Sequence, residues 1–123
     1  FNIVTFSDET AFFKPQFVNP TEQVILEGAS YFSAASPHKT SGYIEKDMLE
    51  ALEEVAKMHP TIIVLFSDGI LTSGVPNPKE IRLTAAASPR VFAMGIEMAE
   101  DFPGAVLLDM LAHYSDGEFW LVD

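Results

Sequence analysis

Ser67 and Asp68 are the residues of this chain whose types and position are best suited to chemistry. They directly follow Thr61–Phe66, a β-branched and aromatic run with no polar residue after Thr61. Such a run is typical of a strand buried on both faces in the middle of a mainly parallel sheet. Because ligands of open α/β sheets bind at the carboxyl ends of the strands, we expect a polar site at Asp68.

Asp68 has two interpretations. Its carboxylate can be one oxygen ligand of a hard divalent cation, which needs several oxygen donors. In Asp68-Gly69 it can instead be a turn residue, since Asp-Gly is a common turn pair. We expect Ser67 to be a turn hydroxyl or a hydroxyl that hydrogen-bonds to a metal ligand without contacting the metal.

A second group of acidic residues, Glu97, Glu100 and Asp101, follows another apolar run, Arg90–Ile96, near the same expected edge. A solvated loop is the simpler interpretation of this group, and a surface that meets a basic partner is the other. The histidines lack the spacing of metal ligands and are expected at the surface or at helix ends; they are His38, His59 and His113.

An enzymatic alternative also centres on Asp68. The stretch VLFSDGILTSG is similar to the signature of haloacid-dehalogenase-type phosphatases, Asp-x-Asp-Gly-x-x-Thr, and would imply a magnesium-dependent hydrolase. The nucleophilic Asp of that signature falls on Phe66, so the chemistry has no nucleophile. The chain also has no Gly-x-Ser-x-Gly elbow around Ser73 or elsewhere, and no glycine-rich phosphate loop after a strand.

The elements expected to position these residues alternate along the chain. The first two are strands, Phe1–Phe6 and Ala11–Val18, which we expect to pair antiparallel at a sheet edge because Pro15 cannot donate to a ladder. The others are helices Glu22–Ser33 and Tyr43–His59, strand Thr61–Phe66, a helix from Pro78 to Ser88 capped by Asn77 with Glu80 in its first turn, strand Arg90–Ile96, helix Ala105–Tyr114 and strand Glu118–Val122. The alternation from Tyr43 onward predicts an α/β fold with a doubly wound, Rossmann-like, mainly parallel sheet.

Hydrophobic spacing predicts which side chains these helices bury. They are Val24, Ile25, Leu26, Ala29 and Phe32 in the first helix; Ile44, Met48, Leu52, Val55 and Ala56 in the second; and Val106, Leu107, Met110 and Leu111 in the last. The second helix is expected to turn Glu45, Asp47, Glu50, Glu54 and Lys57 to water. Core packing is the expected role of the aromatic residues Phe12, Phe13, Phe17, Phe119 and Trp120.

Composition limits the classes of partner. The 123 residues suit one domain, and 18 acidic against 7 basic residues give a formal net charge of −11. Such a chain repels phosphate backbones and anionic lipid, so we expect no nucleic acid partner and favour divalent cations or basic protein surfaces. It has no cysteine, and no apolar run near the roughly 20 residues that span a bilayer, so no direct membrane insertion is expected. Because Phe1 already lies in an expected strand, we expect this domain to be part of a longer polypeptide.

With these elements in order, the chain resembles a von Willebrand factor A (VWA) domain of the bacterial and inter-alpha-trypsin-inhibitor-heavy-chain-like group. The resemblance rests on FNIVTFSD before a hairpin, IIVLFSDG followed by LTSGVPNPKEI, and RVFAMGI followed by LLDMLAHYSDGEFWLV. It covers essentially the whole chain, from the family's second strand to its last. It implies a VWA-like fold and a non-enzymatic role in protein binding or cell adhesion.

Members of that family typically carry a metal-ion-dependent adhesion site that holds magnesium or manganese. Its ligands are an Asp-x-Ser-x-Ser after the first strand, a Thr ahead of the long helix and an Asp at the end of the fourth strand. The resemblance places Asp68 in the last position and Tyr43 in the Thr position, with Thr40 and Ser41 nearby but out of register. The first strand and its motif are missing, so the resemblance implies an incomplete site that binds Mg²⁺ or Mn²⁺ only if another segment supplies ligands.

The missing first strand implies an open position in the sheet between Phe1–Phe6 and Thr61–Phe66, with two exposed backbone edges. We hypothesise that an upstream segment or another chain supplies this strand; direct pairing of the two flanking strands would contradict the hypothesis. In a second interpretation, Phe1–Phe6 is the family's first strand and Asp8-x-Thr10 a shortened metal motif. Against it, Ala11–Val18 reads as a strand where a helix should begin.

The expected function is therefore a non-enzymatic interaction module that binds at the carboxyl edge of the sheet. The expected contact residues are Ser41, Tyr43, Ser67, Asp68 and Glu97. The expected partner is another protein or another segment of the same parent protein. A purely structural domain of a larger protein is the remaining alternative. The resemblance to VWA domains favours an extracytoplasmic location.

Overall fold

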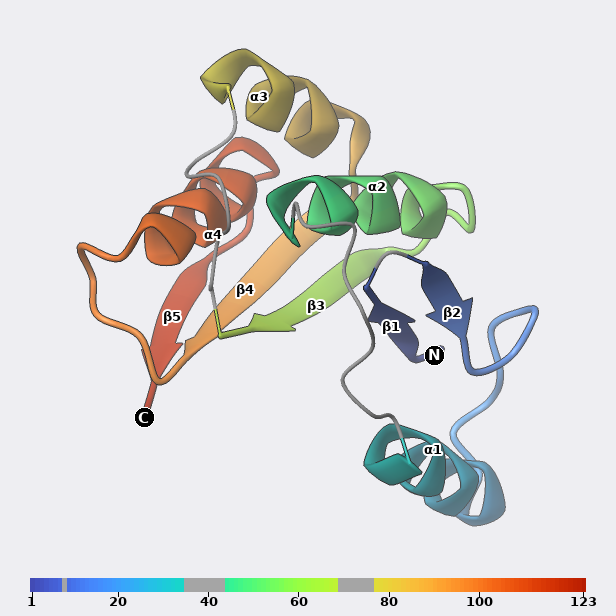
Figure 1. The fold of residues 1–123 in the computed structure, drawn as a ribbon. Coiled ribbons are helices and arrows are strands. Elements are labelled where there is room, and N and C mark those ends of the chain that lie inside the picture. The colour runs from blue at the N-terminus through green and yellow to red at the C-terminus, as the bar shows by residue number, and fades with distance from the viewer. Residues whose placement is uncertain (8, 35–43, 69–76) are drawn as a thin grey trace.

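A computed structural model describes residues 1–7, 9–34, 44–68 and 77–123. It has a mixed α/β fold in which a three-stranded parallel sheet is flanked by helices and accompanied by a two-stranded antiparallel hairpin (Figure 1). This arrangement is consistent with a Rossmann-like fold, as the alternation of elements predicted.

The hairpin consists of β1 (Val4–Phe6) and β2 (Thr10–Phe12), which pair antiparallel as expected. The second strand is much shorter than the predicted Ala11–Val18. The side chain of Asn2 explains why the ladder ends, because it bonds both backbone groups of Lys14: its Nδ2 donates to the Lys14 carbonyl at 2.8 Å, and its Oδ1 accepts from the Lys14 amide at 3.1 Å. Pro15 follows without an amide hydrogen, and backbone pairing resumes at Val18, whose amide donates to the Phe1 carbonyl at 2.9 Å.

The central sheet contains β3 (Ile62–Ser67), β4 (Arg90–Ile96) and β5 (Phe119–Val122) in that order, all parallel. Helices α2 (Ile44–Ala56), α3 (Pro78–Ala87) and α4 (Pro103–Tyr114) lie together on one side of it (Figure 1). The strand β4 has its predicted bounds. The start of α3 also matches its prediction, because Asn77 Oδ1 caps the helix by accepting from the Lys79 amide at 2.9 Å, with Pro78 in the first turn.

The hydrophobic core lies between this sheet and the three helices. Its strand residues alternate along β3 and β4, so they come from one face of the sheet. The main buried side chains are Met48, Leu52, Ile63, Leu65, Ile81, Val91, Ala93, Leu107, Leu108 and Leu111.

The prediction that the central strand is buried on both faces is wrong. In β3, Ile62, Val64 and Phe66 are 50%, 48% and 57% exposed, whereas Ile63 and Leu65 are buried. Among the described residues, helices pack against the odd-numbered face of the sheet only, which leaves the even-numbered face open. An apolar run cannot distinguish these cases, because both faces of this strand carry the same residue types.

The apolar face predicted for the first helix is also mostly wrong. Helix α1 (Glu22–Ala34) exposes Ile25, Leu26 and Phe32, with exposed fractions of 51% to 65%. It packs on the hairpin at Gly28, where a Cβ would lie 3.0 Å from Ile3 Cδ1. Figure 1 shows α1 on the opposite side of the hairpin from α2 and away from the central sheet, so its apolar stripe does not reach the core.

Other side chains also differ from their predicted burial. Asp47 is buried rather than solvated, because α2 packs against both β1 and α3 and its buried face is wider than one stripe. Val106 is 41% exposed because the inward positions of α4 go to Leu107 and Leu108. Trp120 and Phe17 are 41% and 46% exposed and do not belong to the core.

Candidate functional site

The carboxyl ends of the three parallel strands meet at one edge of the sheet. The register pairs Ser67 with Gly95 and Gly95 with Leu121, so the chain leaves all three strands at nearly the same level. The residues that follow are Asp68 after β3, Glu97 after β4 and Asp123 after β5, and all three are exposed. The edge therefore gathers three carboxylates from segments far apart in the sequence, and we call it the acidic edge.

Glu97 is held at this edge by its backbone. Its φ of 53° lies in the left-handed region, which costs a non-glycine residue about 1 kcal/mol or more. Its amide donates to the Val122 carbonyl at 2.8 Å, which extends the contact between β4 and β5. Met98 then folds back over Gly95, where a Cβ would lie 2.6 Å from the Met98 Sδ. Gly95 thus leaves room for a tight turn that fixes the position of Glu97.

The other predicted site residues are distributed as follows. Ser67 is half-buried at the end of β3, next to Asp68. Glu100 and Asp101 are exposed between β4 and α4, on the segment that leaves the same edge. Ser41, Tyr43 and Gly69 lie outside the described residues, as do Asp8, Thr40, Ser73 and His38. The structure thus brings Asp68 and Glu97 to one edge, as predicted.

The two described histidines lie at helix ends, as predicted. His59 follows α2 with a φ of 55°, and His113 lies in the last turn of α4 with its ring 5.3 Å from that of Tyr114. Both side chains are exposed.

A metal site is not assembled by the described part of the chain alone. Within residues 1–7, 9–34, 44–68 and 77–123, no three His, Asp or Glu side chains converge in a way that could hold a metal ion. The acidic edge presents carboxylate oxygens, which Mg²⁺ and Mn²⁺ prefer. A cation at Asp68 therefore requires further oxygen donors. Binding of Mg²⁺ or Mn²⁺ at Asp68 stays a prediction.

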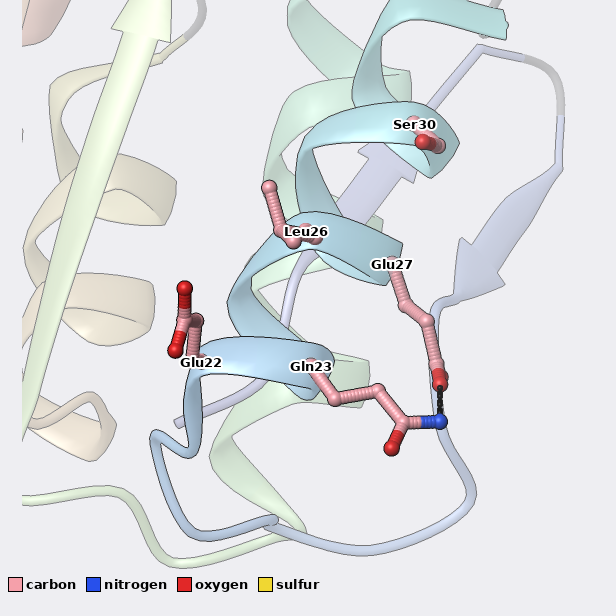
Figure 2. Close-up of a pocket in the computed structure, with 5 residues that line it drawn as sticks. All are labelled: Glu22, Gln23, Leu26, Glu27 and Ser30. Atoms are coloured by element: carbon pink, nitrogen blue, oxygen red, sulfur yellow. Dashed lines mark hydrogen bonds between the residues drawn. The ribbon is translucent and has the colours of Figure 1, made fainter.

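Helix α1 carries a shallow surface depression lined by Glu22, Gln23, Leu26, Glu27 and Ser30 (Figure 2). Glu27 accepts hydrogen bonds from the Lys14 ammonium and from the Gln23 amide, both at 3.1 Å. These bonds, chiefly that from Lys14, lower the pKa of Glu27 from its ordinary value. All five lining residues are exposed, so this surface does not enclose a small molecule.

One residue of the acidic edge was missed in the sequence. Asp123 follows the last predicted strand just as Asp68 follows the central one, and this parallel position was the signal that could have identified it. The even-numbered apolar face of the sheet was missed as well, since no sequence signal marks it.

Comparisons with known proteins bear on the fold of this chain and not on its function. The structure is similar to the crystal structure of the conserved hypothetical protein BatB from Bacteroides thetaiotaomicron, with a TM-score of 0.67 and 14% identity over 99% of this chain and 70% of that one. A looser match, with a TM-score of 0.36 and 20% identity over 98% of this chain and 67% of the other, is to an uncharacterized membrane spanning protein from Vibrio fischeri, and we base no argument on it. No family model and no curated protein matches the sequence. Among the described helices of this chain, none is long and apolar enough to cross a bilayer.

Proposed function

We propose that this chain is a non-enzymatic protein-interaction module of the VWA type, which binds its partner at the acidic edge. The observation that supports this proposal is the position of Asp68, Glu97 and Asp123, which three parallel strands deliver to one exposed edge. In α/β sheets this edge is where binding sites form. The partner is another protein, or another segment of the same polypeptide.

The chemistry of the edge suits two modes of binding. Its carboxylates can meet Lys or Arg side chains of a basic partner, where complementary charge mainly speeds association and selects the partner. They can also hold Mg²⁺ or Mn²⁺ that bridges to an acidic group of the partner. The second mode needs oxygen donors beyond Asp68, from the segment around Ser41 and Tyr43 or from another segment.

A missing strand is part of the same proposal. Among the described residues, β1 and β3 belong to separate sheets, and each has a strand neighbour on one side only. Unpaired strand edges accept an extended segment through backbone hydrogen bonds. An added strand between β1 and β3 would join the two sheets and could bring metal ligands to the edge beside Asp68.

Native mass spectrometry of the material isolated from its source tests the interaction. We expect a bound polypeptide that is lost when Asp68→Ala is combined with Tyr43→Ala. The matched control is Asp109→Ala, which removes one exposed carboxylate from α4, and it should retain the complex. If the double variant binds as the unchanged chain does, the acidic edge is not the binding site.

Thermal unfolding tests the cation. A cation that binds only the folded state raises the Tm by mass action, so MgCl₂ or MnCl₂ should raise it above NaCl at equal ionic strength. The gain should appear in the complex that carries the missing strand and disappear in its Asp68→Ala variant. Equal Tm values in the complex with either salt would remove the metal from the proposal while leaving the basic-partner mode.

A further inference from the structure

No element of the described chain covers the even-numbered, apolar face of the central sheet, and this face is separate from the acidic edge. Strand register places every even-numbered residue of β3, β4 and β5 on the same side, because Val64 pairs with Phe92 and Met94 with Trp120. We call this side the open face. Its apolar members are Ile62, Val64, Phe66, Phe92, Met94, Ile96, Trp120 and Val122.

The open face exposes an unusual amount of apolar surface. Five of its side chains are between 40% and 57% exposed: Ile62, Val64, Phe66, Trp120 and Val122. Phe66 and Trp120 alone expose on the order of 200 Å², if a whole aromatic side chain has about 200 Å². With the three aliphatic residues, the patch reaches the few hundred Å² at which exposed apolar surface marks an interaction site.

The kind of element that fits this face follows from the sheet. Parallel sheets occur almost only with both faces covered, and helices are what covers them. Here α2, α3 and α4 cover the odd-numbered face (Figure 1). The open face is three strands wide, or about 10 Å between the outer strands, which is close to the diameter of one helix. The seven residues of β4 extend about 23 Å, the length of a helix of about 15 residues.

The charge of the chain selects the occupant further. By the same alternation Glu118 lies on the open-face side of the sheet, and its carbonyl accepts from the Ala93 amide at 2.9 Å. Arg90 lies on the same side, with its guanidinium 5.2 Å from the centre of the Phe92 ring. The whole chain carries a net charge of −11, so a second copy is repelled while a basic segment is attracted.

We propose that the open face binds an amphipathic helix whose apolar stripe packs on Val64, Phe66 and Trp120 and whose flanks carry Lys or Arg. The bound helix covers the open face, as α2, α3 and α4 cover the other face of the sheet. The site lies on the face of the strands, whereas the proposed function concerns their carboxyl edge, so the two proposals stand or fall separately.

Trp120 provides the readout, because it is the one tryptophan in the chain and it lies on the open face. The probe is a synthetic helical peptide of about 15 residues, free of tryptophan, with a leucine stripe and lysine flanks. Titration should shift the Trp120 emission to shorter wavelength in a saturable way. A peptide of the same composition in scrambled order, and one with glutamate in place of lysine, should bind on the order of tenfold more weakly.

Matched variants locate the binding site. Phe66→Ser removes an apolar side chain from the open face, and Leu83→Ser removes one of similar exposure, 62%, from α3. Phe66→Ser should weaken peptide binding on the order of tenfold, as for the central anchor of an interface, and Leu83→Ser should leave it unchanged. Both positions are more than half exposed, so both variants are expected to fold, which far-UV circular dichroism checks.

Three results would overturn the proposal. One is an unsaturable emission change, or equal binding of the ordered and scrambled peptides. Another is equal loss in Phe66→Ser and Leu83→Ser. The last is a dimer of the chain alone that Phe66→Ser converts to a monomer in light scattering, because the occupant would then be a second copy. Loss of the complex in the Asp68 and Tyr43 double variant, with peptide binding intact, would support the separation of the two sites.

Discussion

At the residue scale, one hydroxyl links helix α4 to strand β4. Ser115 Oγ accepts from the Val91 amide at 2.9 Å and donates to the Ala112 carbonyl at 3.1 Å, and Val91 is fully buried. Ser115→Ala leaves the Val91 amide without its acceptor, which should lower the free energy of unfolding by about 1–3 kcal/mol. Urea denaturation measures the loss.

Ser88 supplies the control for this prediction. Its Oγ is also buried but has no hydrogen-bond partner in the structure as described. Ser88→Ala removes an unsatisfied polar atom, so it should leave the free energy of unfolding unchanged or raise it slightly. Equal losses in the two variants would show that the Ser115 bond is not the cause.

Gly117 is a second residue whose type is fixed by its surroundings, because its position leaves no room for a side chain. A Cβ at this position would lie 1.8 Å from the Val91 carbonyl oxygen, and that atom belongs to the backbone of a buried strand. Gly117→Ala must displace either β4 or the turn, so we expect it to cost about 3 kcal/mol or more in urea denaturation. Asp116→Ala is the adjacent control: its φ of 66° implies a cost of only about 1 kcal/mol.

At the element scale, two substitutions in β3 test whether only one face of the sheet is covered. Leu65 is 7% exposed and Val64 is 48% exposed, although they are neighbours in one strand. Leu65→Ala should lower the free energy of unfolding by about 2–5 kcal/mol, and Val64→Ala by less than about 1 kcal/mol. Urea denaturation of the chain alone measures both losses, and similar large losses would mean that the open face is covered in solution.

The bounds of some elements were predictable from the sequence, and those of others were not. The bounds of β4 and the Asn77 cap of α3 were predictable because they depend on neighbouring residues. The length of β2 was not, since the side chain of Asn2, in the segment before β1, occupies the backbone groups of Lys14. Asp68 and Glu97 were placed at one edge correctly, because parallel strands deliver their carboxyl ends together.

At the scale of the whole molecule, net charge should govern stability. A net charge of −11 favours expansion by self-repulsion. Four carboxylates line one surface depression between the hairpin and α2, those of Glu9, Glu50, Glu53 and Glu54, together with Thr10 and Phe12. NaCl screens such repulsion, with a Debye length of about 30 Å at 0.01 M and about 3 Å at 1 M. We expect the Tm to rise over this range.

A charge-removing pair checks the local part of this prediction. Glu53→Gln removes one carboxylate from the crowded surface and should raise the free energy of unfolding at low salt by about 0.5 kcal/mol. Asp109→Asn removes the same charge from α4, outside this surface, and should have the smaller effect. Equal effects of the two variants would show that net charge, and not this local group, dominates.

The sequence by itself determined the order and type of the elements, the acidic charge and the residues that follow each strand, because these depend on local propensity and on composition. Tertiary structure alone decided which face of each element is buried. Ile62, Val64 and Phe66 are as apolar as their neighbours, and they are exposed because the helices of the described chain pack on the other side of the sheet. Burial depends on which elements meet in space, and an apolar strand has the same composition whether one or both of its faces are covered.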